Sequence, residues 1–153
     1  MLKAKDIMTR DVKTVTPDTP ALEAASILLG NHLNGLPVLD REGRVLGIIC
    51  QSDLVFQQEK IPLPSFFSIL GGWVPLRSSE QIENEIKKMA ALTVADAMTA
   101  DPVTVGPDTP VDEIATIMVR MNVHTLPVIE EGRLAGIIGK EDILKTLLKP
   151  ENQ

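Results

Sequence analysis

The apolar positions of this chain fall into short blocks, and their spacing separates expected strands from expected helices. Residues 36–39 and 45–50 are nearly continuous apolar runs of strand length, bounded by polar residues and glycine. The residues between them, 41–44, are polar and contain a glycine, which predicts a hairpin turn. The two runs are therefore expected to form a pair of antiparallel strands.

Helices are expected on both sides of this hairpin. Thr19 is a good N-cap residue and Pro20 suits the first helical position, so a helix is predicted to begin there and to end near Gly30. Its predicted apolar face holds Leu22, Ala25, Ile27, Leu28 and Leu29. A short extended segment is expected at 13–16 and a further helix at 52–57, which gives the order β-α-β-β-α.

The strongest feature of the sequence is that this pattern occurs twice. Segments 6–9, 14–20 and 36–38 return at 96–99, 104–110 and 126–128 with an offset of 90 residues, and 47–49 returns at 136–138 with an offset of 89. The second copy repeats the helix start at Thr109 and Pro110, with a predicted apolar face of Ile114, Ile117, Met118 and Met121. Self-similarity at a fixed offset indicates two copies of one structural unit.

The repeat predicts three parts: a first motif at 1–57, an insert at 58–92 and a second motif at 93–153. A single motif of this size would leave one face of its sheet uncovered, whereas two motifs related by a pseudo-twofold axis can bury their sheets against each other. The predicted fold class is therefore α/β (α+β), with two β-α-β-β-α motifs packed into one globule. In the insert, Ser79 is expected to cap a helix through about residue 89, and this segment either covers its own core or contacts a partner.

Composition narrows the choice of function. The chain has 153 residues with 15 basic and 21 acidic side chains, a net charge of −6 and no basic run, which argues against duplex nucleic acid as a partner. Its one cysteine, Cys50, excludes an intrachain disulfide and suits the reducing cytoplasm. No apolar run is long enough to cross a bilayer, so no transmembrane segment is expected, and the charged N-terminus does not resemble a signal peptide.

The ordered set of repeated motifs resembles a tandem pair of CBS domains, the module named after cystathionine β-synthase. The set consists of Met-Thr near each start, Thr-Val followed by Pro-Asp-Thr-Pro, then Leu-Pro-Val, and finally Gly-Ile-Ile with an Asp four residues later. The resemblance implies a regulatory, energy-sensing module that binds AMP, ADP, ATP or S-adenosylmethionine in a cleft between the motifs. It also implies a homodimer and a regulated partner protein, and it requires no cofactor.

The resemblance assigns roles to particular residues. Asp53 and Asp142 are expected to hold the ribose hydroxyls, as carboxylates do in dinucleotide sites. The phosphate candidates are Ser52 and Lys140, at the helix starts, and His124, just before Leu126-Pro127-Val128. The expected walls for the base are Val15, Leu36, Pro37, Val105, Leu126 and Pro127. We expect Asp53 and His124 to share one cleft if the clefts are built across the motifs.

Two departures from the family pattern motivate an alternative. The Thr or Ser expected three residues before each Asp is Cys50 in the first motif and Gly139 in the second, and Thr125 stands where some members have an Arg for phosphate. Asp53 and Asp142 could then be plain helix caps, and the chain a ligand-free dimerisation scaffold.

Catalysis is not expected from this sequence. We find no set of nucleophile, base and orienting group, no metal-ligand spacing of Cys and His, and no P-loop. We therefore assign no catalytic and no metal-binding residues.

Overall fold

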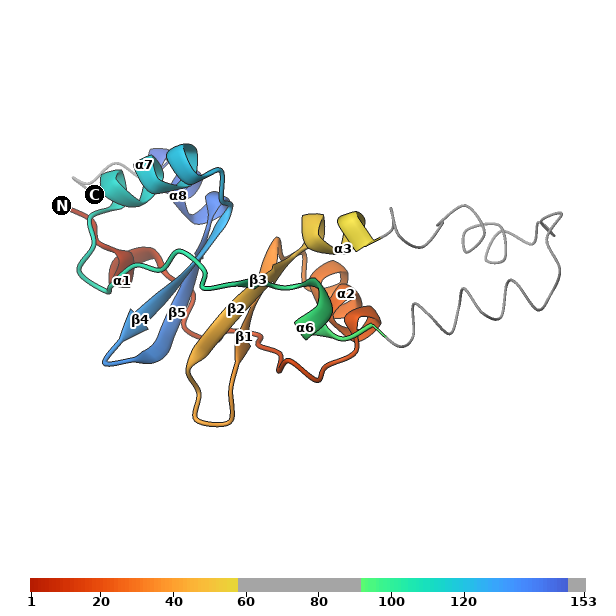
Figure 1. Cartoon of the computed structure of the whole chain (residues 1–153). Helices are drawn as coiled ribbons and strands as arrows, with labels where there is room; N and C mark the ends of the chain where they lie inside the picture. Colours follow the sequence, from red (N-terminus) through yellow and green to blue (C-terminus); the bar gives the residue numbers. More distant parts are fainter. Residues whose placement is uncertain (58–91, 149–153) are drawn as a thin grey trace, which may run out of the picture.

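A computed structural model describes residues 1–57 and 92–148 (Figure 1). The first half contains α1 (Ala4–Ile7), α2 (Ala21–Gly30), β1 (Gly35–Leu39), β2 (Val45–Cys50) and α3 (Gln51–Gln57). The second half contains α6 (Val94–Ala97), β3 (Thr99–Ala100), α7 (Val111–Met121), β4 (Thr125–Glu130), β5 (Arg133–Gly139) and α8 (Lys140–Leu148). The helix expected to begin at Ser79 lies outside the described residues.

The predicted hairpins are confirmed in both motifs. Strand β1 pairs antiparallel with β2, and β4 pairs antiparallel with β5, and each pair has a register shift toward its hairpin turn. The hairpin turns contain Gly43 and Gly132 at φ values of +84° and +79°, a region that favours glycine because it has no Cβ. The extended segments around Val15 and Val105 run parallel to β1 and β4, as the order β-α-β-β-α requires.

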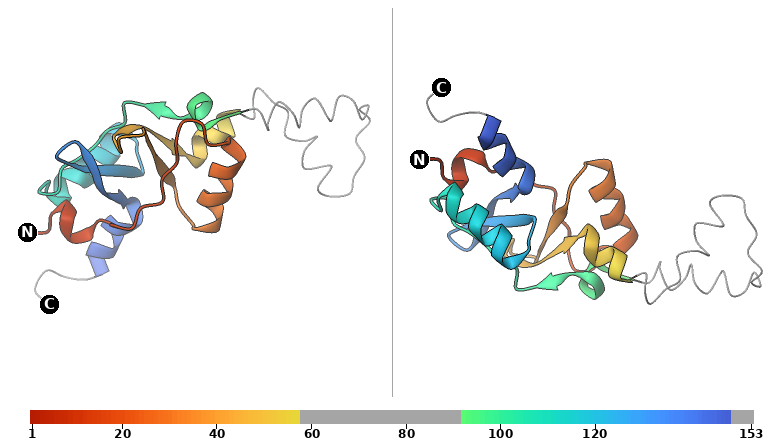
Figure 2. Two further views of the ribbon diagram at one scale, coloured as in Figure 1. Left: turned by 90° about the horizontal axis from the view of Figure 1, so that it is seen from below. Right: turned by 90° about the horizontal axis from the view of Figure 1, so that it is seen from above.

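The two motifs lie side by side, with α2 and α3 at one end of the described part and α7 and α8 at the other (Figures 1 and 2). Each motif has its own hydrophobic core. One core is built around Leu28, Leu36 and Ile49, and the other around Ile114, Leu126 and Ile138.

The motifs exchange their leading helices. Ala4 of α1 is fully buried in the core of the second motif, and Val94 of α6 is fully buried in the core of the first. Backbone hydrogen bonds hold both leading helices against the opposite motif. Ala4 N–H donates to Thr109 O (2.9 Å), and Val94 N–H donates to Thr19 O (2.8 Å). Each core therefore needs residues from both halves of the chain.

Glycines in the second strand of each hairpin allow the exchanged segments to approach. A Cβ on Gly136 would lie 2.6 Å from Met8 Sδ, and a Cβ on Gly47 would lie 2.6 Å from the carbonyl oxygen of Thr99. Real Cβ atoms essentially never lie this close to another atom, and backbone oxygens, Thr99 O at Gly47 and Thr9 O (2.9 Å) at Gly136, cannot move away easily, so glycine suits both positions.

The predicted helix caps are wrong. Helices α2 and α7 have Pro20 and Pro110 at their N-cap positions, without a side-chain cap. The hydroxyl of Thr19 accepts instead from Thr16 N–H at 3.1 Å, and that of Thr109 accepts from Gly106 N–H at 3.0 Å. Both threonines therefore stabilise the turn that precedes the helix, a local bond that competes with capping.

The predicted apolar faces need a partial correction. Helix α2 buries Ala21, Ala24 and Leu28, while Leu29 is 69% exposed. Helix α7 buries Ile114 and Met118 as expected, but Met121, predicted on the same face, is 57% exposed. The buried positions follow helical spacing, and the small Ala side chains let α2 lie close to the sheet.

Candidate ligand-binding clefts

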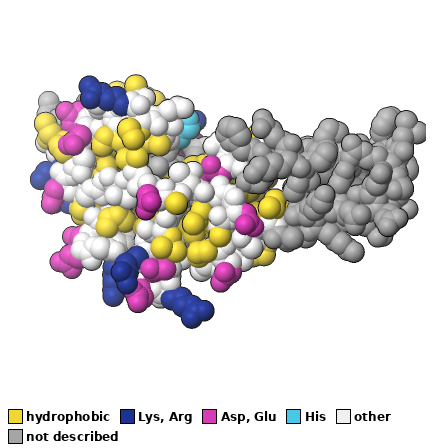
Figure 3. All heavy atoms as spheres, viewed as in Figure 1, with side chains coloured by type: hydrophobic (Ala, Val, Ile, Leu, Met, Phe, Trp, Pro, Cys, Tyr) yellow, Lys and Arg dark blue, Asp and Glu magenta, His cyan; other side chains and the backbone are white. Residues whose placement is uncertain are grey.

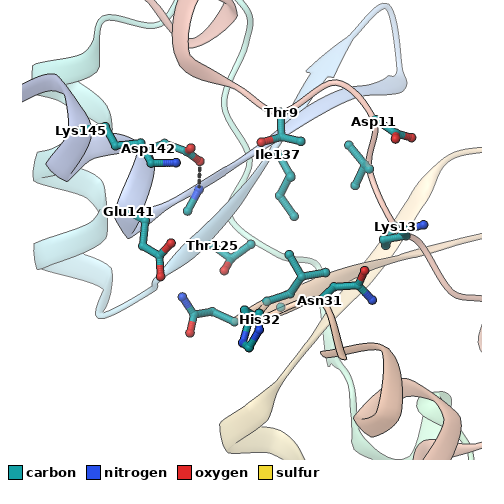
Figure 4. Close-up of a pocket in the computed structure, with 15 residues that line it drawn as sticks. Thr9, Asp11, Lys13, Asn31, His32, Thr125, Ile137, Glu141, Asp142 and Lys145 are labelled. Carbon is teal, nitrogen blue, oxygen red and sulfur yellow. Dashed lines mark hydrogen bonds between the residues drawn. The ribbon is translucent and has the colours of Figure 1, made fainter. Parts of the chain in front are cut away.

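Two clefts lie between the motifs and are related by the internal repeat. The first, which we call the Asp142 cleft, has a volume of about 390 Å³ (Figure 4). The second, the Asp53 cleft, has a volume of about 400 Å³. Both volumes lie in the range of small-molecule sites.

Each cleft is built from both motifs. The Asp142 cleft is lined by residues from 9–13 and 31–35 of the first motif and from 137–145 of the second. The Asp53 cleft reverses these roles, with residues from 99–103 and 122–125 of the second motif and 48–53 of the first. The exchange of leading segments produces this arrangement, because it carries Thr9 beside β5 and Thr99 beside β2.

The two aspartates occupy the same place in their clefts. Asp53 is the third residue of α3, and its Oδ2 accepts from the backbone N–H of Cys50 at 2.7 Å. Asp142 is the third residue of α8, and its Oδ2 accepts from Gly139 N–H at 2.8 Å. This is the carboxylate half of a capping box, so each Asp does cap its helix, but from three positions beyond the N-cap position suspected from the sequence.

The capping bond also orients the carboxylate. Because Oδ2 is held by the backbone, Oδ1 of each Asp is the oxygen that remains for another donor. The Oδ1 atom of Asp53 accepts from the hydroxyl of Thr99 at 3.3 Å, a long contact between the motifs. A carboxylate oxygen has two lone pairs, so this contact leaves acceptor capacity in the cleft.

Cys50 precedes α3 and lines the Asp53 cleft. Burial, and to a smaller extent the negative charge of Asp53, raise the pKa of its thiol from 9.0 to about 11. The thiol is therefore neutral at physiological pH and is a weak hydrogen-bond donor.

The phosphate candidates do not all reach a cleft. Ser52 and His124 line the Asp53 cleft together with Asp53. Lys140 lines neither cleft, and its backbone N–H donates to His124 O at 3.0 Å.

Two other lysines line the Asp142 cleft. Lys145 lies on α8, and Lys13 lies on the segment that crosses from the first motif (Figure 4). Lys145 follows Glu141 and Asp142 by four and three residues, so helical periodicity alone would have placed all three on one face. No sequence signal pointed to Lys13, because only the tertiary structure brings its segment from the first motif beside the second.

The expected base-binding residues lie in the cores. Leu36, Pro37, Leu126 and Pro127 are fully buried, and Val15 and Val105 are only 5% and 7% exposed. None of the six lines either cleft. The apolar lining comes instead from side chains beside them, among them Ile48, Val103 and Val123 in the Asp53 cleft and Val12, Leu33 and Ile137 in the Asp142 cleft.

Three residues in the left-handed backbone region line the clefts. His32 and Asn122 follow α2 and α7 at equivalent positions of the repeat, with φ values of 54° and 52°. Asp101 in the Asp53 cleft has a φ of 50°. Asn and Asp adopt this region more readily than most residues, so the backbone strain is modest.

Within residues 1–57 and 92–148, no three His, Cys, Asp or Glu side chains are grouped as a metal site. Over the same residues, no helix combines the length and the apolar character needed to cross a membrane.

Two repeated motifs that exchange their leading helices and enclose two equivalent clefts define a pseudo-twofold tandem module. The family profile of the CBS domain matches residues 4–59 and 94–149. The chain therefore belongs to the CBS domain family, as a tandem pair.

Known proteins agree with this assignment along nearly the whole chain. The uncharacterized protein MJ1426 of Methanocaldococcus jannaschii is 30% identical, over 94% of this chain and 90% of its own length. The solved CBS domain of a CBS domain-containing membrane protein from Sphaerobacter thermophilus is 31% identical, with a TM-score of 0.73 over 95% of this chain and 87% of that one. The CBS domain pair of protein MJ0100, solved in complex with 5′-methylthioadenosine and S-adenosyl-L-methionine, is 26% identical, with a TM-score of 0.69 over 96% of both chains.

Proposed function

We propose that this protein is a regulatory module that binds an adenosine-type ligand in the clefts between its motifs. The observation that carries the proposal is the pair of aspartates, Asp53 and Asp142, each held by a backbone N–H at the mouth of an equivalent cleft. A carboxylate with one oxygen anchored and the other available can accept the hydroxyl protons of a ribose. The similar MJ0100 pair, with two adenosyl compounds bound, supports the same ligand class.

Asp53 and Asp142 hold the ribose, and the apolar side chains that line each cleft contact the base. Ser52 and His124 lie where the rest of the ligand extends in the Asp53 cleft. The ligand is AMP, ADP, ATP or S-adenosylmethionine, and its binding needs no catalytic residue.

A ligand in either cleft contacts both motifs, because each cleft is lined from both halves of the chain. Binding therefore changes the balance between arrangements of the two motifs, provided that the ligand has a different affinity for each arrangement. A partner protein that recognises one arrangement would respond to the ligand.

Calorimetry and thermal denaturation with AMP, ADP, ATP and S-adenosylmethionine test the proposal. A ligand at roughly 100 times its Kd should raise the free energy of unfolding by about 2.7 kcal/mol. The double variant Asp53→Asn/Asp142→Asn keeps an acceptor for each backbone N–H but loses both charges, and it should lose this stabilisation. The matched control is Asp18→Asn, an exposed carboxylate that lines neither cleft. Absence of heat and of thermal shift with all four compounds would refute the proposal.

A ligand-free dimerisation scaffold is the second candidate. Two observations favour it: each aspartate already has a backbone partner, and large apolar side chains are exposed on α7 and α8, namely Val119, Met121, Leu144, Leu147 and Leu148. This candidate predicts a dimer by sedimentation equilibrium and no response to the four compounds. It also predicts that Asp53→Ala lowers stability by only about 1 kcal/mol, the value of a helix cap.

A further inference from the structure

The two clefts differ in the charges that line them. Among the residues that the structure describes, the Asp142 cleft is lined by two lysines, Lys13 and Lys145, whereas no Lys or Arg lines the Asp53 cleft. The difference is visible in the sequence of the repeat. Val103 occupies the position equivalent to Lys13, and Phe56 occupies the position equivalent to Lys145. Symmetry of the backbone therefore does not extend to the charge of the clefts.

The lysines of the Asp142 cleft come from opposite walls. Figure 4 shows Lys145 on α8 beside Asp142, and Lys13 across the cleft on the crossing segment next to Asp11. Within the described residues neither lysine forms an ion pair with a protein carboxylate. Both ammonium groups are therefore available to an anionic ligand, although the carboxylates of Asp11, Glu141 and Asp142 also line this cleft.

The Asp53 cleft differs in that its described carboxylates are not accompanied by a lysine or an arginine. Its charged lining consists of the carboxylates of Asp53 and Asp101, and His124 is its one side chain that becomes cationic on protonation, again among the described residues. A phosphate placed there would face two carboxylates, and no Lys or Arg of residues 1–57 and 92–148 lines the cleft to offset them, which is unfavourable in a partly enclosed site. A sulfonium cation would be attracted by the same two carboxylates.

We propose that the clefts are selective by ligand charge: the Asp142 cleft binds the phosphorylated nucleotide, and the Asp53 cleft binds an adenosyl ligand without phosphate, such as a sulfonium. The proposal rests on the adenosine-type function proposed above and adds which cleft takes which ligand. It replaces the sequence-based assignment of Ser52 and His124 to phosphate, since both line the cleft of Asp53, whose described lining contains no lysine.

The single cysteine of the chain provides a reporter for one cleft, because Cys50 lines the Asp53 cleft and not the Asp142 cleft. The rate of Cys50 alkylation by iodoacetamide at pH 9, followed by mass spectrometry, therefore measures occupancy of the Asp53 cleft. S-adenosylmethionine should slow alkylation in a concentration-dependent way. AMP, at concentrations that calorimetry shows to be saturating, should leave the rate unchanged.

Lysine variants test the other cleft. Lys13→Gln and Lys145→Gln should each weaken AMP binding by about tenfold, the value of one charge-assisted hydrogen bond, and leave Cys50 protection by S-adenosylmethionine unchanged. Lys140→Gln is the matched control on the same helix, since Lys140 lines neither cleft, and it should bind AMP as the parent protein does.

The outcomes separate this proposal from the general function. Protection of Cys50 by AMP, or undiminished AMP affinity in both Lys13→Gln and Lys145→Gln, overturns the charge selectivity while leaving an adenosine-binding module. Absence of binding by both compounds overturns the selectivity and the proposed function together.

Discussion

Residues with repeated positions in the sequence turn out to have unequal surroundings. Asp53 and Asp142 have the same anchoring bond, and this equivalence was predictable from their spacing after Gly-Ile-Ile. The shared cleft of Asp53 and His124 was expected only on the condition that clefts form across the motifs. Lys140 was expected to contact phosphate but lines neither cleft. A residue at the start of a helix need not face the same way as one five positions later, here Lys145, which does line a cleft.

Cys50 gives a pH-dependent prediction at this scale. Because its pKa is raised from 9.0 to about 11, its thiolate fraction at pH 8 should be about 100-fold below that of an unperturbed thiol, and alkylation should slow accordingly. Asp53→Asn should accelerate alkylation, since the Asp53 charge contributes to the shift. The rate is measured by mass spectrometry from pH 7 to 11.

The same shift affects stability. In the unfolded chain the thiol ionises at a lower pH than in the folded protein. The contribution of the neutral thiol to the free energy of unfolding is therefore complete below pH 9 and is lost as the pH rises towards 11. Cys50→Ala, which has no thiol to titrate, should show a smaller loss of stability in urea over that window. Equal losses in both proteins would contradict the raised pKa.

At the scale of elements, local pattern predicted the hairpins and the helices that flank them, but neither the short leading helices α1 and α6 nor the contacts between elements. Strands β1, β2, β4 and β5 follow from apolar runs and turn glycines, which act through neighbouring residues. The buried face of α2 was harder to predict, because alanines rather than the larger Leu22 and Leu29 face the core. Side-chain size decides such a choice only once the distance between helix and sheet is known.

Gly47→Ala tests the approach of the crossing segment to β2. The new Cβ would lie 2.6 Å from the carbonyl oxygen of Thr99, and backbone cannot move away as a flexible side chain can. We expect a loss of about 1–3 kcal/mol in the free energy of unfolding, measured by urea denaturation.

Gly30→Ala is the control for that substitution. A Cβ at Gly30 meets no atom within 4 Å, so stability should stay the same or rise by up to about 1 kcal/mol. A Gly47→Ala protein as stable as the Gly30→Ala protein would argue against the close crossing.

At the scale of the whole molecule, the exchange of leading helices makes the two motifs interdependent. Met8 belongs to the first motif by sequence but packs against the core of the second, and Met98 packs against the core of the first. Lys and Arg side chains are scattered over the face shown in Figure 3 without forming one patch, in keeping with a net charge of −6.

Met8→Ala should therefore weaken the distant motif. We expect a loss of about 1–3 kcal/mol, because Met8 is only partly buried, with a larger loss of amide hydrogen-exchange protection in β4 and β5 than in β1 and β2. Met98→Ala is the symmetric control and should reverse the pattern. Greater loss in β1 and β2 for Met8→Ala would mean that α1 packs on its own motif.

The sequence by itself determined the repeat, both hairpins, the helices that flank them and the position of each aspartate at the start of a helix, because these features depend on residues close together in the chain. Only the tertiary structure decided which core receives each leading helix, that Leu-Pro-Val is buried rather than exposed to a ligand, and that Lys13 and Lys145 line one cleft while the other has no lysine in its described lining. Two similar motifs offer each leading helix two equivalent cores. Which core a leading helix joins depends on packing over the whole molecule, and this cannot be predicted from the pattern of neighbouring residues.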